Sequence, residues 1–393
     1  MTHDTCPFLV IYVVWHPFFS EGPEIAETLR QHFRRNLYEN VAGGAGVSVI
    51  FRSAVSPDAE VPISIDLDEA HSTAVVILVD ENLSTNQAWI EYVQELAVRT
   101  EKKGLGARIF PVSFNQKVLA RLNIEEQALR WDRWQGTKPE QLQLLTSSLT
   151  YQFCRMLRHY LEHLKRPSED EEALEAYLKK VQIFLSHSKH DDKGEEIAYA
   201  IRDRLHAGNG LAGFFDVHDI PAGLKFNKVL LQQVKVSAMV AIHTDSYSSR
   251  EWCRREIIEA KRWSVPLVIA NSLNDLDERG FPYMGNVPVV RLDTDDNRIN
   301  FVIGRLLDEV LKDFLWRCQV IIFQDNTMKN VFFVPRPPEL ISLAILPPEI
   351  ETPDPIIVYP DPPLSKEEQR LFEEICPRVQ LRSLNEWLAG AAQ

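Results

Sequence analysis

The sequence has few cysteines and no long apolar run. Only five of its 393 residues are cysteine, and no two of them have the CxxC spacing. A disulfide framework and a cysteine-based zinc site are therefore both excluded, and we expect a cytoplasmic protein in a reducing environment. Apolar runs such as Phe8–Trp15 are far shorter than the roughly 20 residues of a membrane-spanning helix, so no membrane partner is expected. No charged and then apolar segment precedes a cleavage site, which predicts no secretory leader.

An excess of positive charge is also missing. The 43 lysines and arginines face 56 aspartates and glutamates, which gives a formal net charge of −13. Nucleic-acid phosphates attract basic surfaces, so this balance argues against broad binding to DNA or RNA but does not exclude a local basic groove. Hydrophobic residues make up 45% of the chain and charged residues 25%, both ordinary for globular proteins. The length allows two or three domains.

Two regions, residues 1–138 and 181–318, repeat one order of apolar strands and amphipathic helices. In the first region we expect strands at Phe8–Val14, Val47–Phe51, Thr73–Val79 and Arg108–Val112, and helices at Glu24–Leu37 and from Trp89. In the second we expect strands at Val181–Ser186, Leu211–Asp216, Ala238–His243, Pro266–Ala270 and Pro288–Leu292, and helices at Gly194–His206, Phe226–Val234, around Trp252 and at Phe301–Trp316. Strands that alternate with helices predict a parallel sheet. The repeat indicates either related α/β domains or the order that all doubly wound domains share.

Two further segments complete the predicted organisation. Residues 139–180 are expected to form a helical connector, because Gln141–Leu164 is a long amphipathic pattern and Ser168 with Glu171 has capping-box spacing. Residues 319–393 include a proline-rich stretch, two short strands and two helices, expected at Val331–Val334, Ile356–Tyr359, Lys366–Glu374 and Leu384–Leu388. This C-terminal appendage is too small for a large core of its own and is predicted to pack on a neighbour.

One segment of the second region combines an aromatic residue with a carboxylate. The apolar strand Ala238–His243 ends in a polar turn, and the helix that follows carries Trp252 and Glu256. Residues four apart lie on one face of a helix. Open α/β sheets place their ligand sites at the carboxyl ends of the strands. The pattern therefore predicts a site that holds a ring and stabilises a sugar cation.

Three ordered motifs in this region resemble those of the Toll/interleukin-1 receptor (TIR) family. They are Ile183–Ser188, Phe215–Gly223 and Tyr247–Glu256. The first resembles the signature box on the family's first strand, and the second resembles its second box and exposed loop. The third resembles the segment that carries the catalytic glutamate in the enzymatic members. Together they span less than a third of the chain.

The resemblance implies a flavodoxin-like domain with a parallel sheet, and it implies NAD as substrate with no cofactor. Enzymatic members cleave the nicotinamide–ribose bond, and the product is linear or cyclic ADP-ribose. Bacterial members often serve antiviral defence, and catalysis often needs TIR domains side by side. We therefore expect an NAD glycohydrolase or ADP-ribosyl cyclase that self-associates and responds to a protein partner or trigger. The alternatives are a noncatalytic assembly adaptor and an N-glycosidase that acts on other nucleotides.

Glu256 is the predicted catalytic residue. A pyridinium leaving group departs neutral, so one carboxylate that stabilises the positive charge on the ribose is sufficient. Glycosidases that protonate a leaving oxygen usually need two carboxylates. The alternative is an ion pair on the helix surface with Arg254, Arg255 or Arg262.

The resemblance also implies which residues shape the substrate cleft: Ser186, His187, Ser188, Asp216, Phe226, Tyr247 and Trp252. For the serines the alternative is capping of the following turn, and for Trp252 it is core packing. Cys253 is expected to be inert, because no base has triad-like spacing to it. The segment His187–Asp192 holds possible ligands, but no second cluster accompanies it, so no metal site is predicted.

The first region resembles a degenerate TIR domain that lacks the catalytic carboxylate. Trp89 falls where Trp252 falls in the second region, and Val93 then takes the place of Glu256. Glu91 lies about 160° around the helix from Val93, and Glu95 comes too late in the sequence. We therefore expect the first region to be a noncatalytic partner domain.

Overall fold

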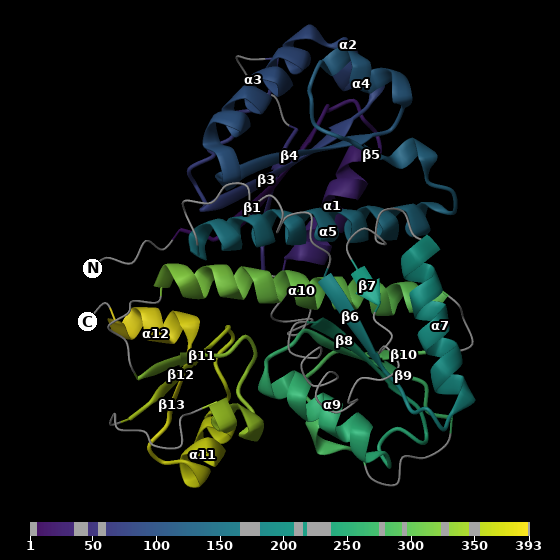
Figure 1. The fold of residues 1–393 in the computed structure, drawn as a ribbon. Coiled ribbons are helices and arrows are strands. Elements are labelled where there is room, and N and C mark those ends of the chain that lie inside the picture. Colours follow the sequence, from purple (N-terminus) through teal and green to yellow (C-terminus); the bar gives the residue numbers. More distant parts are fainter. Residues whose placement is uncertain are drawn as a thin grey trace. The chain divides into compact units, whose positions relative to one another are not determined.

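The chain forms two compact α/β units, Thr5–Leu178 and Lys179–Gln393 (the latter with Met1–Asp4). The computed structural model describes residues 6–34, 46–53, 60–165, 181–207, 215–217, 237–274, 280–292, 297–323, 330–345 and 354–391. Every strand pair within these residues is parallel. The predicted α/β class with parallel sheets is confirmed (Figure 1).

The first unit holds a five-stranded sheet in the order β2–β1–β3–β4–β5. Its strands are β1 (Leu9–Trp15), β2 (Ser48–Arg52), β3 (Ser72–Val79), β4 (Ala107–Ser113) and β5 (Leu129–Arg130). Its helices are α1 (Gly22–Phe33), α2 (Glu81–Thr85), α3 (Gln87–Lys103), α4 (Gln116–Leu122) and α5 (Lys138–Lys165), with 3-10 turns η1 (Gly104–Gly106) and η2 (Trp131–Arg133). Every residue of β1 and β3 is buried, and apart from Ser72 and Thr73 at the start of β3 both strands consist of apolar and aromatic residues, as is usual for strands covered on both faces.

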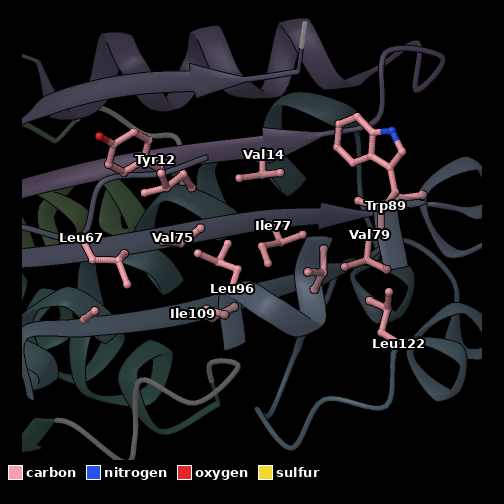
Figure 2. Close-up of a cluster of buried hydrophobic side chains, with 14 of the residues drawn as sticks. Tyr12, Val14, Leu67, Val75, Ile77, Val79, Trp89, Leu96, Ile109 and Leu122 are labelled. Atoms are coloured by element: carbon pink, nitrogen blue, oxygen red, sulfur yellow. The ribbon is translucent and has the colours of Figure 1, made fainter. Parts of the chain in front are cut away.

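One face of this sheet packs against α3. Alternate residues of a strand point to the same face, so Val14 of β1 and Val79 of β3 join Trp89 of α3 in one apolar core (Figure 2). We call this core the α3 cluster, and its buried members include Val10, Tyr12, Val14, Val75, Ile77, Val79, Leu83, Trp89, Val93 and Leu96.

The long helix α5 belongs to the first unit. The ring of Phe153 in α5 lies 5.2 Å from that of Phe33 in α1 and 5.3 Å from that of Phe110 in β4. The larger part of the predicted connector is therefore a helix packed on the first sheet. Residues 166–180, where a second connector helix is predicted, lie outside the described residues.

The second unit repeats the strand order of the first. Its larger sheet runs β10–β9–β8–β6–β7, so the first strand of each unit lies between its second and third strands. The strands are β6 (Val181–Ser186), β7 (Phe215–Val217), β8 (Ser237–His243), β9 (Leu267–Asn271) and β10 (Val289–Arg291). The helices are α7 (Asp192–Ala207), α9 (Glu251–Arg262) and α10 (Asn297–Phe323), with the 3-10 turn η4 (Pro282–Met284). This is the doubly wound order of flavodoxin-like domains.

The C-terminal appendage forms a small parallel sheet in the order β11–β12–β13. Its elements are β11 (Val331–Phe333), η5 (Leu340–Ile345), β12 (Ile356–Tyr359), α11 (Lys366–Ile375), β13 (Gln380–Ser383) and α12 (Leu384–Ala391). Val358 packs with Trp316 of α10 and Trp387 of α12 on one face, whereas Ile357 faces a second core. The predicted boundary between residues 318 and 319 falls inside α10, so this helix serves both the larger sheet and the appendage.

Among the residues that the structure describes, none of the helices combines the length and the apolar character that crossing a bilayer requires. The two longest helices, α5 and α10, instead bury apolar residues against parallel sheets of their own units.

Candidate active site

Glu256 lies on α9, the helix that follows β8. Its side chain is buried, with 6% of the residue exposed, and it joins no ion pair among the described residues. Neighbouring arginines have other partners: Arg255 pairs with Glu251 at 2.8 Å, and Arg262 lies 3.8 Å from Glu259. Glu256 thus faces the interior of the unit, whereas the Arg255–Glu251 pair lies on the exposed side of the helix.

Two hydroxyl groups connect Glu256 to the carboxyl edge of the sheet. Ser186, the last residue of β6, donates its hydroxyl hydrogen to Glu256 Oε2. The phenol oxygen of Tyr247, from the turn between β8 and α9, lies 2.6 Å from Ser186 Oγ. Because β6 and β8 are adjacent parallel strands, their carboxyl ends meet at this edge, and the turn brings Tyr247 back over them. We call Tyr247, Ser186 and Glu256 the hydroxyl chain.

Burial dominates the electrostatics of Glu256. Removal of the carboxylate from water raises its pKa from 4.5 to about 7, while the hydrogen bond from Ser186 and the charge of Lys189 act in the opposite direction. The charged and neutral forms are therefore both populated near neutral pH. Carboxyls with such shifted pKa values are frequent at functional sites.

Trp252 and Cys253 flank the acid along α9. Trp252 is half-buried against the core, and the guanidinium carbon of Arg255 lies 5.1 Å from the centre of its ring. Burial raises the pKa of Cys253 to about 12, and its thiol lies 3.8 Å from the carbonyl oxygen of His187. A thiol that stays protonated at neutral pH is a poor nucleophile.

His187 and Ser188 follow the end of β6. His187 is half-buried, and its buried Nδ1 atom has no hydrogen-bond partner among the described residues. An orphaned buried nitrogen is consistent with a ligand contact. Ser188 is buried, and its hydroxyl accepts a hydrogen bond of 3.4 Å from the backbone of His190. Ser188 thus has the capping contact that the sequence offered as its alternative role.

Two predicted cleft residues are placed only in part or not at all. Asp216 lies in β7 opposite Gln182 of β6, but its side chain is not described. Phe226, with the predicted exposed loop, lies outside the described residues. Their predicted roles stay predictions.

The polar segment after β6 forms the start of α7. Asp191 Oδ1 accepts a hydrogen bond of 3.1 Å from the backbone of Lys193, and Asp191 Oδ2 accepts one of 3.1 Å from the hydroxyl of Ser246. Within the described part of the chain, no group of three or more His, Cys, Asp or Glu side chains is placed to hold a metal ion.

Sequence reasoning placed Ser186 and Tyr247 near the acid but assigned them to substrate. It missed the hydrogen bonds that join them to Glu256. One signal was present: Ser186 comes two residues after Phe184, a core residue, so both side chains point to the face that α9 covers. Lys189 was also missed, although it follows this strand by three residues.

Residues 183–299 match the sequence model of one protein family, described as the TIR domain. The match supports a TIR domain in the second unit. It includes the whole hydroxyl chain and ends near the start of α10, whereas the first unit lies outside it. No curated protein matches the chain.

Two solved structures share a distant similarity with the chain. The protein PH0766 from Pyrococcus horikoshii OT3 is 10% identical, with 79% of this chain and 66% of that chain covered and a TM-score of 0.26. The tagatose-6-phosphate ketose/aldose isomerase from Escherichia coli is 11% identical, with coverages of 78% and 83% and a TM-score of 0.21. Similarity this low gives no guide to the chemistry of the TIR domain.

Proposed function

We propose that this protein is a cytoplasmic NAD glycohydrolase or ADP-ribosyl cyclase of bacterial antiphage defence. The observation that carries the proposal is the buried Glu256, held through one oxygen at the carboxyl edge of the sheet inside the segment that matches the TIR domain. A buried carboxylate that joins no ion pair among the described residues is costly to a fold, so its retention favours a chemical role.

The proposed chemistry uses Glu256 as an anion beside the ribose. As the bond between the ribose C1′ and the nicotinamide nitrogen breaks, both bonding electrons go to nicotinamide, which leaves neutral. The positive charge that develops on the ribose is stabilised by the Glu256 carboxylate, and its low-dielectric surroundings strengthen that interaction. Trp252 and His187 are proposed to bound the cleft on either side of the acid.

The fate of the cation decides between the two products. Attack by water gives linear ADP-ribose, and attack by an adenine nitrogen of the same molecule gives cyclic ADP-ribose. Both routes share the step at Glu256, so both depend equally on its charge. We further propose that TIR domains of several copies associate to complete the cleft, with a protein trigger that promotes this assembly.

Nicotinamide release is the decisive measurement. The full chain is incubated with NAD at high protein concentration, and products are identified by mass spectrometry. Replacement of Glu256 by Gln should lower the rate at least about 100-fold, because it removes the charge that stabilises the transition state. The matched control is Glu251→Gln on the same helix, where an exposed ion pair is lost and activity should be retained.

The alternatives give different products in the same assay. An N-glycosidase with another substrate would spare NAD but release the base from a different nucleotide. A noncatalytic adaptor would release nothing, and NAD levels in cells would be the same with Glu256 and with Gln at this position. Equal nicotinamide release by the wild type and Glu256→Gln would refute the proposed role of the acid.

A further inference from the structure

The hydrogens of the hydroxyl chain can be assigned by counting donors. A serine hydroxyl has one hydrogen, and Ser186 donates it to Glu256 Oε2 when the acid is ionised. The contact of 2.6 Å between Ser186 Oγ and the Tyr247 phenol must then have Tyr247 as its donor. The order of donation is Tyr247 to Ser186 to Glu256, and every hydrogen in it points toward the carboxylate.

Burial separates these two hydroxyls from any substrate. Ser186 is 1% exposed and Tyr247 is 0% exposed, so neither can reach a bound molecule without a rearrangement of the core. Glu256 Oε1, by contrast, accepts no hydrogen bond from a described residue. The chain therefore occupies one oxygen of the carboxylate and leaves the other for a ligand.

The first unit supplies an internal comparison. In the sheet registers, Val14 of β1 pairs with Ile77, two residues before β3 ends, just as Ser186 pairs with Ala241, two residues before β8 ends. Leu83 lies four residues after β3, and Tyr247 lies four residues after β8. At the positions that correspond to Ser186, Tyr247 and Glu256 of the hydroxyl chain, the first unit has Val14, Leu83 and Val93. All three belong to the α3 cluster. Where the carboxylate is absent, both hydroxyls are absent too.

We propose that Ser186 and Tyr247 are positioning residues, whose hydroxyls act in series to keep Glu256 ionised and oriented for cleavage of the substrate. This inference rests on the proposed function for its consequence in catalysis, but the hydroxyl chain itself can be tested without NAD. The raised pKa of Glu256 makes the test sensitive, because donors to a carboxylate stabilise its charged form.

The test is a pH titration of the Glu256 side-chain carbon by NMR, in the full chain labelled with 13C-glutamate and assigned with Glu256→Gln. Ser186→Ala should raise the pKa of Glu256 by about one unit or more, since a lost hydrogen bond to a charged group has this order of effect. Tyr247→Phe, which removes a single oxygen and keeps the buried ring, should raise it by less. Ser272→Ala and Tyr283→Phe, in the same unit, are the controls and should leave it unchanged.

Activity separates positioning from substrate binding. Both variants should shift the acidic limb of the kcat profile upward by the shift seen in NMR, with KM for NAD unchanged. An unchanged Glu256 pKa together with a raised KM would overturn the proposal and assign the hydroxyls to substrate. If the variants raise the pKa of Glu256 but the wild type does not cleave NAD, the proposed function fails while the role of the hydroxyl chain is upheld. Tyr247→Phe keeps the test valid if Ser186→Ala does not fold.

Discussion

The two units build different interiors on one sheet order. In both, the first strand lies between the second and third, and a helix that follows the third strand covers the same face. The second unit holds polar groups at three equivalent positions, and the first unit fills them with valine and leucine. The residues are Ser186, Tyr247 and Glu256 in one unit and Val14, Leu83 and Val93 in the other. A few side chains thus decide whether this edge is a core or a candidate site.

The comparison has an energetic side. The α3 cluster consists of apolar side chains and the ring of Tyr12. Burial of Val93 in this cluster therefore carries no cost for removing a charged group from water. The second unit instead buries a carboxyl group whose pKa is raised by the loss of water. Sites commonly cost stability in this way, because function requires groups that a core would exclude.

The largest expected effect comes from transfer of the acid alone into the first unit. Val93→Glu would bury a carboxyl group without hydroxyl donors and should destabilise this unit by about 4 kcal/mol. Hydrogen exchange of the β1 and β3 amides, followed by mass spectrometry, reports the change in this unit. Val98→Glu, on the same helix at a residue that is 49% exposed, is the control and should have little effect. Equal protection in the two variants would show that the α3 cluster tolerates the acid.

The next largest effect is expected from Glu256→Gln, which removes the buried ionisable group from the second unit. Because the pKa of Glu256 is raised when folded, the native state holds the proton in the window from 4.5 to about 7, and stability of the wild type falls as pH rises through it. Glu256→Gln should abolish this loss, which amounts to roughly 3 kcal/mol for such a shift. Urea denaturation at pH 5 and pH 8 measures it, and Glu251→Gln is the control. If wild type and Glu256→Gln differed in unfolding free energy by the same amount at pH 5 and at pH 8, the raised pKa of the buried Glu256 carboxyl would be contradicted.

A smaller effect is expected where the appendage contacts the helix that carries the acid. Lys261 of α9 is buried and donates to both oxygens of Glu339, each at 2.7 Å, and to the carbonyl of Gly285. Glu339→Gln would leave this ammonium without its counter-charge and should cost about 2 kcal/mol, less than for a fully buried pair because Glu339 is partly exposed. Thermal unfolding measures it, with the exposed Glu373→Gln as control. No difference between the two would mean that the pair contributes nothing.

Most strands and helices were predictable because their signal is local. β6 and β12 begin and end at the predicted residues, and the strands of the first sheet differ from prediction by one residue at most ends. The short strands β5 and β13 were not predicted, because two to four residues give too little periodicity. α10 extends well beyond its predicted range of Phe301–Trp316, since its last turns are fixed by packing on the appendage.

The position of the candidate site was predictable from the sequence, but its hydrogen bonds were not. The spacing of Trp252 and Glu256 and the strand before them located the acid. The hydrogen bonds from Ser186 and Tyr247 depend on how β6 and β8 pair, which a single sequence does not specify. The domain limits are harder still, because the pairing of Lys261 with Glu339 joins residues that are far apart in the chain.

That pairing changes what counts as one folding module. Arg336 also reaches from the appendage to the carbonyl of Val265, at 2.6 Å, just past the end of α9. A fragment trimmed to the residues that match the TIR domain would cut α10 short and strip the ammonium of Lys261 of its anion. The segment that matches the TIR domain is therefore smaller than the compact unit that contains it, because residues of the C-terminal appendage complete the polar contacts of α9.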